Sequence, residues 1–275
     1  MRFSLALVLA AGLVTLAAAV QPPPATDPAA PPAVGNSQPA AATQPKGIPV
    51  PDGPVVNKQE LEDGLIIEDI TIGDGYEVKP GGAVVVHYHG TLKEGGKEFD
   101  SSFSRGEPIS FPLGNVIPGW QKGVPGMKIG GVRRLTIPSK LGYGEQGAGA
   151  SIPPNSDLVF TIQLVDAMQI EDTKVGEGEA ASVNCVAVTA FSVKDGEGKE
   201  VEKADAAHPY IWLPGEFQAI SFGLDGMKPG GKRTIRVPKE MNVTAPGAPA
   251  TRPSNVPLTI EVELIAVRNL GPRGQ

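Results

Sequence analysis

Cysteine and aromatic residues are scarce in this sequence of 275 residues. The only cysteine is Cys185, so no disulfide can form within the chain, and the cysteine count gives no information on the compartment. We expect Cys185 to be a small buried hydrophobic residue. Aromatic residues make up 5% of the chain, so the places where they cluster are informative.

The sequence also has little net charge and lacks the patterns of nucleotide, metal or nucleophile chemistry. Its formal net charge is −6 and is spread along the chain, which does not favour nucleic acid or an anionic membrane surface as a partner. It contains no P-loop, no convincing catalytic triad and no zinc pattern. The sequence therefore gives no sign of a cofactor or of a metal.

Two histidines on one face of an expected strand, His87 and His89, raise the question of a metal site. Two potential ligands without a third or fourth are weak support for such a site. Exposed polar strand residues are the simpler interpretation, so we expect both side chains to face solvent.

The N-terminal segment has the pattern of a signal peptide. Arg2 precedes an apolar run that closes with Ala17, Ala18 and Ala19, the small residues that a signal peptidase prefers. We expect cleavage after residue 19 and export, to a bacterial periplasm or the medium. The alternative is an uncleaved anchor, because the run approaches the ~18 apolar residues that span a bilayer. Its alanine-rich end favours cleavage, so no stable membrane anchor is expected.

Proline and glycine are abundant, with 28 and 35 copies, and proline is dense directly after this segment. Residues 20–57 carry almost no large apolar side chain and cannot bury a core. We expect a disordered, partly polyproline linker over this range.

A repeat of about one hundred residues organises the rest of the chain. The stretch "GVPGMKIGGVRRLTIP" ends at Pro138, and "GLDGMKPGGKRTIRVP" ends at Pro238. "NSDLVFTIQLVDA" and "NVPLTIEVELIAV" match at the same displacement. The repeat predicts two tandem domains at residues 58–168 and 169–268, followed by a tail at 269–275.

The patterns within each repeat indicate an α+β fold that is mostly strand. In "AVVVHYHG" one strand face carries Val84, Val86 and Tyr88, and in "DLVFTIQLVDA" one face carries Leu158, Phe160, Ile162 and Leu164. Such faces are typical of half-buried strands of an antiparallel sheet. Pro118 suits the first turn of a helix, and Pro125 disfavours helix at the residue before it. We therefore expect one helix of about two turns against a bent sheet.

Several motifs of the first repeat together resemble the FK506-binding proteins, a family of peptidyl-prolyl cis-trans isomerases. They are "VVHYHGTL", "GKEFDSS", "GNVIPGW", "GMKIGGVRRLTIPSKLGYG" and "IPPNSDLVFTIQLVD", in the family's order and spacing. The resemblance covers about residues 61–168 and implies a bent antiparallel sheet wrapped round one short helix, with an apolar pocket between them; the repeat extends this fold to the second domain. It also implies isomerisation of X-Pro bonds in unfolded or partly folded proteins, and binding of FK506-like macrolides.

The resemblance assigns site residues by position in the motifs. It implies an aromatic pocket in which the catalytic residues are Tyr88, Phe99, Asp100, Tyr143 and Phe160. It implies that substrate is bound by a second set, Ile109, Phe111, Val116, Ile117, Trp120 and Ile152. Ile109 stands where many members carry phenylalanine, which should widen one wall. Taken singly, each of these aromatic side chains is also consistent with an ordinary hydrophobic core.

The second repeat keeps the framework and loses the pocket. Trp120, Tyr143 and Phe160 correspond to Ile220, Val243 and Ile260; Phe99 and Asp100 correspond to Val201 and Glu202; Tyr88 falls opposite Thr189 or Ala190. We expect a similar fold without isomerase activity. Its aromatic residues are expected to fill its own core, with a docking surface as the alternative: Phe191, Tyr210, Trp212, Phe217 and Phe222.

A second function remains open for the whole chain. A pocket of this kind can hold proline segments without useful turnover, as a chaperone or docking module does. The complete set of pocket residues in the first repeat favours catalysis.

Overall fold

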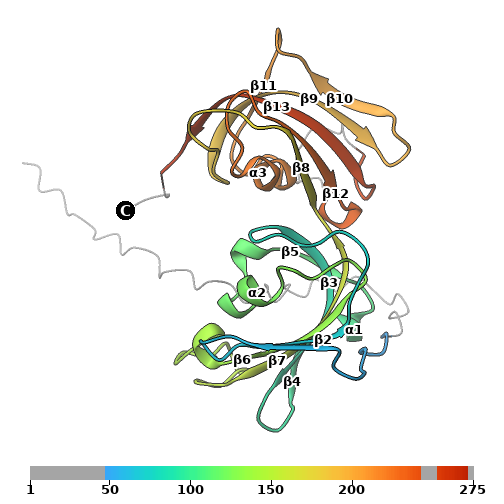
Figure 1. Cartoon of the computed structure of the whole chain (residues 1–275), viewed down its shortest axis with the longest axis vertical. Coiled ribbons are helices and arrows are strands. Elements are labelled where there is room, and N and C mark those ends of the chain that lie inside the picture. The colour runs from blue at the N-terminus through green and yellow to red at the C-terminus, as the bar shows by residue number, and fades with distance from the viewer. Residues whose placement is uncertain (1–46, 243–252, 272–275) are drawn as a thin grey trace, which may run out of the picture.

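The computed structural model describes residues 47–242 and 253–271, and it contains two antiparallel sheets joined in tandem (Figure 1). The expected signal peptide and most of the expected linker lie outside the described residues, as does the end of the tail. No helix in the described ranges is long and apolar enough to cross a bilayer.

The first sheet has seven strands in the order β1-β2-β6-β7-β3-β4, and β5 pairs with β3 beside this path. All of its pairings are antiparallel. The strands are β1 (Asn57–Glu60), β2 (Ile66–Thr71), β3 (Ala83–Leu92), β4 (Glu98–Ser101), β5 (Ile109–Pro112), β6 (Val132–Ile137) and β7 (Leu158–Ala167).

The helix α2 (Pro118–Gly123) lies in the bend of this sheet. It begins at Pro118 and has six residues, so the prediction of a short helix ended before Pro125 is confirmed. A Cβ at Gly119 would stand 2.5 Å from Ile137, so only glycine lets the helix approach β6 this closely. The other helices of this domain are α1 (Ser102–Arg105), η1 (Leu113–Asn115) and η2 (Ser139–Leu141).

One expectation about β3 is wrong, because this strand is buried on both faces. The His87 ring is 7% exposed and stacks on Phe103 of α1, with ring centroids 5.0 Å apart. The short helix α1 covers the outer face of the strand, which the alternating pattern left for solvent. Burial lowers the pKa of His87, so its ring is neutral at physiological pH.

The second sheet repeats the order of the first, as β10-β9-β13-β12-β8 with β11 on β9. The fold prediction of two tandem α+β units is therefore confirmed. Its elements are β8 (Gln169–Lys174), β9 (Cys185–Asp195), β10 (Glu200–Ala204), β11 (Tyr210–Trp212), α3 (Gln218–Leu224), β12 (Lys232–Val237), η3 (Lys239–Met241) and β13 (Leu258–Asn269). Cys185 is buried in this domain, as predicted.

The repeated sequence stretch carries one arginine that serves the same structural purpose in both domains. Arg133 donates from Nε to Asp69 at 2.6 Å and from Nη1 to the carbonyl of Gly123 at 2.7 Å. Arg233 donates to Asp172 at 2.7 Å and to the carbonyl of Gly223 at 2.8 Å. Each side chain thus ties the neighbouring strand to the carbonyl end of its helix.

The junction between the domains is one residue long. Met168 lies between β7 and β8, and its N–H donates to the carbonyl of Ala83 at 2.9 Å. Met168 and Ala83 are both buried in the hydrophobic cluster of the second domain. The two domains therefore share packing at this point.

Candidate active site

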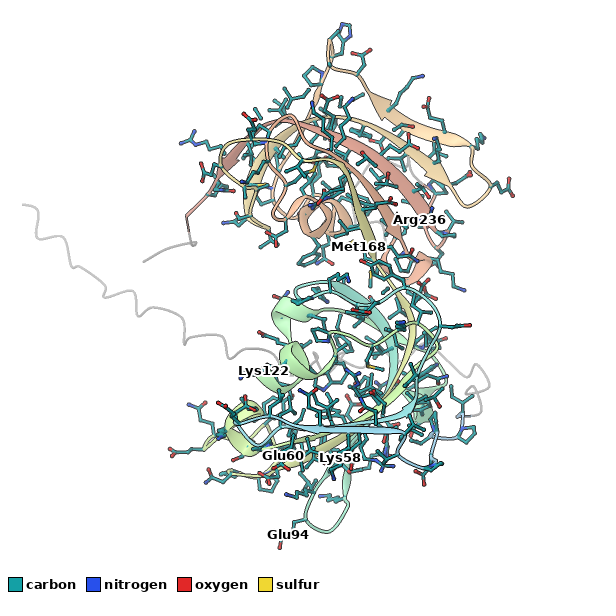
Figure 2. All side chains as sticks on the ribbon, in the orientation of Figure 1. Lys58, Glu60, Glu94, Lys122, Met168 and Arg236 are labelled. Atoms are coloured by element: carbon teal, nitrogen blue, oxygen red, sulfur yellow. The ribbon has the colours of Figure 1, made fainter. Side chains whose placement is uncertain are left out.

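A small apolar hollow lies between α2 and the first sheet, where side chains crowd the space (Figure 2). Its volume is about 30 Å³. The structure brings together seven of the residues predicted for the site, which line this hollow: Tyr88, Phe111, Val116, Ile117, Trp120, Tyr143 and Phe160.

The aromatic walls come from three elements that pack edge to face. Tyr88 stands on β3 and Phe160 on β7, while Trp120 projects from α2. The Trp120 ring lies 5.8 Å from Tyr88 and 5.3 Å from Phe160, with interplanar angles of 82° and 88°. Edge-to-face pairs of this kind stabilise one another, so the walls hold their shape.

Phe99 does not line the hollow but packs against one of its walls. Its ring packs edge-on against Phe160, with centroids 5.5 Å apart. Gly90 makes room for both rings, since a Cβ there would stand 2.7 Å from Phe99 and 2.9 Å from Phe160. The position of the Phe160 wall therefore depends on a glycine in the neighbouring strand.

Asp100 and Tyr88 form a polar edge to this site together with Arg105, which sequence reasoning missed. The Tyr88 hydroxyl donates to Asp100, Arg105 donates to the other Asp100 oxygen at 2.6 Å, and Arg105 Nη2 donates to the Tyr88 oxygen at 3.1 Å. The sequence signal that could have indicated this contact is Arg105 itself, a basic residue five positions after Asp100.

The electrostatics of this edge keep Tyr88 protonated. Burial raises the pKa of its hydroxyl, and the hydrogen bond to Asp100 raises the pKa further. Burial, followed by the charge of Asp100, also raises the pKa of Tyr143. Both tyrosines are therefore neutral hydroxyls at physiological pH, and Tyr143 stands on the wall of the hollow.

Two of the predicted residues stand back from the hollow. Ile152 is 6% exposed and is held in the flap by paired backbone hydrogen bonds with Ala148, of 2.9 and 3.2 Å. Ile109 lies on β5 opposite Val86 and is half-buried at the margin of the core.

The histidines of β3 find partners other than a metal. His87 Nδ1 lies 3.3 Å from the Ser102 hydroxyl, and His89 Nε2 lies 2.9 Å from Glu98. Residues 47–242 and 253–271 contain no group of three or more His, Cys, Asp or Glu side chains placed to hold a metal ion.

The strand register of the second domain corrects one predicted correspondence. Tyr88 pairs with Ile162, and the residue that pairs with Val262 is Phe191, so Phe191 occupies the position of Tyr88. The expected Thr189 or Ala190 is wrong. The β9–β10 hairpin is one residue shorter than the β3–β4 hairpin, which displaced the alignment. An aromatic ring is kept at this position, without its hydroxyl.

The same register supports Glu202 as the counterpart of Asp100. Gly90 pairs with Phe160 and Asp100, and Val193 pairs with Ile260 and Glu202. The counterpart predicted for Tyr143 lies outside the described residues.

Of the aromatic residues of the second domain, Phe191, Trp212 and Phe217 are buried in its own core, as predicted, and Tyr210 packs against them, whereas Phe222 is half-buried and faces the first domain. Trp212 pairs with Ala187 and is 3% exposed, and its indole N–H donates to Thr189 at 3.0 Å. Its ring lies 5.3 Å from Phe191 and 4.5 Å from Tyr210. The rings therefore pack on one another where the first domain has its hollow.

Comparison with known proteins adds sequence relatives to this geometry. The sequence profile of the family described as "FKBP-type peptidyl-prolyl cis-trans isomerase" matches residues 75–165 and again residues 172–265. The "Probable FK506-binding protein" of Corynebacterium glutamicum is 48% identical over 120 residues, which cover 44% of this chain and 96% of that protein. "Peptidyl-prolyl cis-trans isomerase FPR2" of Saccharomyces cerevisiae is 51% identical over 113 residues, 39% of this chain and 81% of that protein.

Solved structures are also similar in part. The crystal structure of FkpA from Escherichia coli is 46% identical over 40% of this chain and 51% of that chain, with a TM-score of 0.38. The structure of the three FKBP domains of wheat FKBP73 covers 76% of this chain and 96% of that chain at 23% identity, with a TM-score of 0.37.

Proposed function

Because this chain belongs to the family of FKBP-type peptidyl-prolyl cis-trans isomerases and is an enzyme of that class, we propose that the hollow of the first domain is where it isomerises X-Pro bonds. The observation that carries this proposal is the convergence of seven predicted residues on one apolar hollow. We assign the isomerase domain to residues 58–168 and a degenerate domain to residues 169–268.

The proposed chemistry is stabilisation of a twisted amide. Rotation about an X-Pro bond has a barrier of about 18–20 kcal/mol, because amide resonance is lost on the way. The planar amide is the more charge-separated form, so a dry aromatic hollow favours the twisted form over the ground state. The Tyr143 hydroxyl and the Ile117 backbone N–H are the proposed donors that hold the substrate carbonyl during rotation. Neither a nucleophile nor a proton transfer is needed.

The polar edge has a separate part in this proposal. Asp100 accepts from Tyr88 and Arg105, so the Tyr88 hydroxyl is held at the edge of the hollow by two partners. The ring of Tyr88 then presents a fixed wall to the substrate proline. We assign Arg105 as a positioning residue that acts through Asp100 and Tyr88.

The proposed substrates are unfolded or partly folded exported proteins with exposed X-Pro bonds, in a bacterial periplasm or outside the cell. The signal-peptide pattern of residues 1–19 supports export. FK506-like macrolides are proposed ligands of the same hollow. The second domain is proposed to lack isomerase activity, because Ile220 and Ile260 replace the walls formed by Trp120 and Phe160.

The competing function is a chaperone or docking module that holds proline segments without turnover. One experiment separates the two: the rate of cis-trans isomerisation of a short X-Pro peptide, followed by protease coupling, with the full chain. We expect acceleration by wild type and a loss of about tenfold or more in kcat/KM for Trp120→Leu, whose smaller side chain removes one aromatic wall of the hollow.

Ile220→Leu is the matched control, since it changes the equivalent position of the second domain. We expect it to leave kcat/KM unchanged. Binding of the peptide without any acceleration by wild type would leave the chaperone interpretation and refute catalysis. A loss with Ile220→Leu equal to that with Trp120→Leu would refute the assignment of activity to the first domain.

A further inference from the structure

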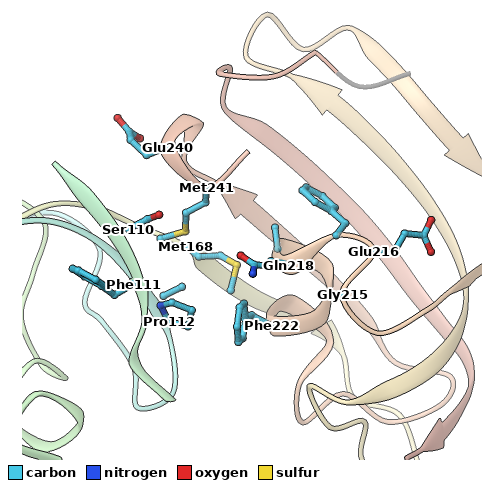
Figure 3. Close-up of a pocket in the computed structure, with 13 residues that line it drawn as sticks. Ser110, Phe111, Pro112, Met168, Gly215, Glu216, Gln218, Phe222, Glu240 and Met241 are labelled. Atoms are coloured by element: carbon cyan, nitrogen blue, oxygen red, sulfur yellow. The ribbon is translucent and has the colours of Figure 1, made fainter. Parts of the chain in front are cut away.

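A second cavity lies between the two domains and is larger than the first (Figure 3). Its volume is about 290 Å³. The first domain contributes β5, the junction contributes Met168, and the second domain contributes α3 and η3 with the turn before α3. The isomerisation proposed for the hollow of the first domain does not use this cavity.

The lining combines apolar side chains that can adapt in shape with polar ones, among them Glu216, Gln218 and Glu240. Met168 and Met241 extend toward the gap between β5 and α3, and Phe222 faces the same gap from α3 (Figure 3). Pro112 forms the opposite wall. Methionine side chains are unbranched and rearrange to fit different apolar groups. The cavity is therefore suited to apolar side chains of varied shape.

The wall formed by β5 is the edge of a sheet. In the described part of the chain β5 pairs with β3 alone. The N–H of Leu113 donates to Gly82 on the β3 side. By strand alternation, the N–H and C=O of Ser110 and the C=O of Pro112, which has no N–H, point to the other edge. Ser110 and Pro112 also line the cavity. A strand edge beside an apolar hollow is the arrangement that recognises an extended polypeptide.

The same strand connects this cavity to the proposed active site. Phe111 of β5 lines both hollows. Its ring packs 5.9 Å from Tyr88 and 5.8 Å from Trp120, on the active-site side. A polypeptide that crosses β5 can therefore occupy both hollows at once.

We propose that the interdomain cavity binds an apolar side chain of the same extended polypeptide whose X-Pro bond lies in the hollow of the first domain. This inference rests on the proposed function. An extended polypeptide advances about 3.3 Å per residue, so a substrate needs about three to five residues to pass across β5 from one hollow to the other. The second domain then contributes to substrate binding through Phe222 and Met241, while the chemistry stays in the first.

The test uses two synthetic peptides of about twelve residues that are identical around one X-Pro bond. One carries leucine and phenylalanine about three to five residues from the proline on either side, and the other carries serine at those positions. With the wild-type full chain we expect kcat/KM to be about tenfold higher for the apolar peptide, because an apolar side chain is buried.

The double variant Phe222→Ser with Met241→Ser should remove this difference and leave the serine peptide's kcat/KM unchanged. Ile211→Ser is the control, because Ile211 is 55% exposed on β11 and is not one of the residues that line the cavity. It should keep the preference. Thermal unfolding of both variants identifies any loss of the second domain's fold; if the double variant unfolds, Met241→Gln replaces it.

The outcomes separate this inference from the proposed function. No acceleration of either peptide by wild type refutes the proposed function. Equal kcat/KM for the two peptides with an active wild type refutes the inference alone, as does a preference that survives in the folded cavity variant.

Discussion

At the scale of single residues, the hydroxyl of Tyr88 shows how position determines chemistry. The side chain is 1% exposed, and its oxygen is shared between Asp100 and Arg105. Such a group resists ionisation because burial and the adjacent carboxylate both disfavour a phenolate. Phe191, at the equivalent place in the second domain, has the ring without this polar function.

A pH dependence of stability follows from this raised pKa. The folded state holds the Tyr88 proton above the ordinary tyrosine pKa of about 10, so the unfolded state loses that proton first. The free energy of unfolding should therefore be unaffected by this group below about pH 10 and should fall as pH rises above it. Urea denaturation of wild type and Tyr88→Phe between about pH 8.5 and 11 measures the difference.

The variant should lose stability less steeply above about pH 10 than wild type does. Parallel curves for the two proteins would show that Tyr88 titrates alike in the folded and unfolded states.

At the scale of elements, the size of the side chains on neighbouring strands determines which residue fits at a given strand position. Gly90 on β3 lies under the Phe99 and Phe160 rings, while its counterpart Val193 on β9 lies beside Ile260. The smaller neighbours of the second domain leave room for a side chain. The second domain can therefore have valine at this position because it lacks the two aromatic rings that crowd Gly90 in the first domain.

A substitution at Gly90 tests this packing. Gly90→Ala should lower the free energy of unfolding by about 1–3 kcal/mol, because the rings must move to admit a methyl group. It should also lower kcat/KM, since the Phe160 wall shifts. Gly114→Ala is the control for stability, because a Cβ there meets nothing within 4 Å. Chemical denaturation measures both; equal stability of Gly90→Ala and wild type would contradict the close packing.

Elements were predictable where local chemistry determines them. Pro118 and Pro125 bounded α2, and the glycine-rich stretch around Arg133 marked the repeat. The residue equivalent to Tyr88 in the second domain was not predictable. The β9–β10 hairpin is one residue shorter than the β3–β4 hairpin, and this deletion shifts the alignment without leaving a recognisable sequence pattern. Arg105 was missed because its contacts depend on how α1 folds back toward β3.

At the scale of the whole molecule, the two domains share a frame but differ in how deeply its charges are buried. The Arg133 and Asp69 side chains are each 10% exposed. In the second domain Arg233 is 7% exposed, but its partner Asp172 is 44% exposed. Water therefore supports the acidic partner in the second domain and not in the first.

This difference predicts unequal losses on removal of the arginines. Arg133→Met should destabilise the first domain by about 3–5 kcal/mol, because Asp69 is left as a buried charge without its partner. Arg233→Met should cost the second domain less, about 1–3 kcal/mol, since Asp172 is hydrated. Calorimetry of the full chain, with Trp120 and Trp212 fluorescence to separate the domains, measures each loss. Equal losses would contradict the role given to burial.

The arrangement of the two domains could not be read from the sequence. The repeat indicated two units, but the one-residue junction and the cavity beside β5 depend on how their surfaces meet. Met168 has the same apolar character whether it ends a strand, joins two sheets or lines a cavity.

The position of β7 in the first sheet determines the order in which the two domains can fold. β7 lies between β6 and β3, so it joins the two parts of the first sheet, although it is the last strand of that sheet to be synthesised. The first sheet cannot close until β7 is available for pairing, and β8 follows β7 after a single residue. The order of the chain therefore sets an order of folding: the first domain can complete its sheet first, and the second domain then assembles against a finished neighbour.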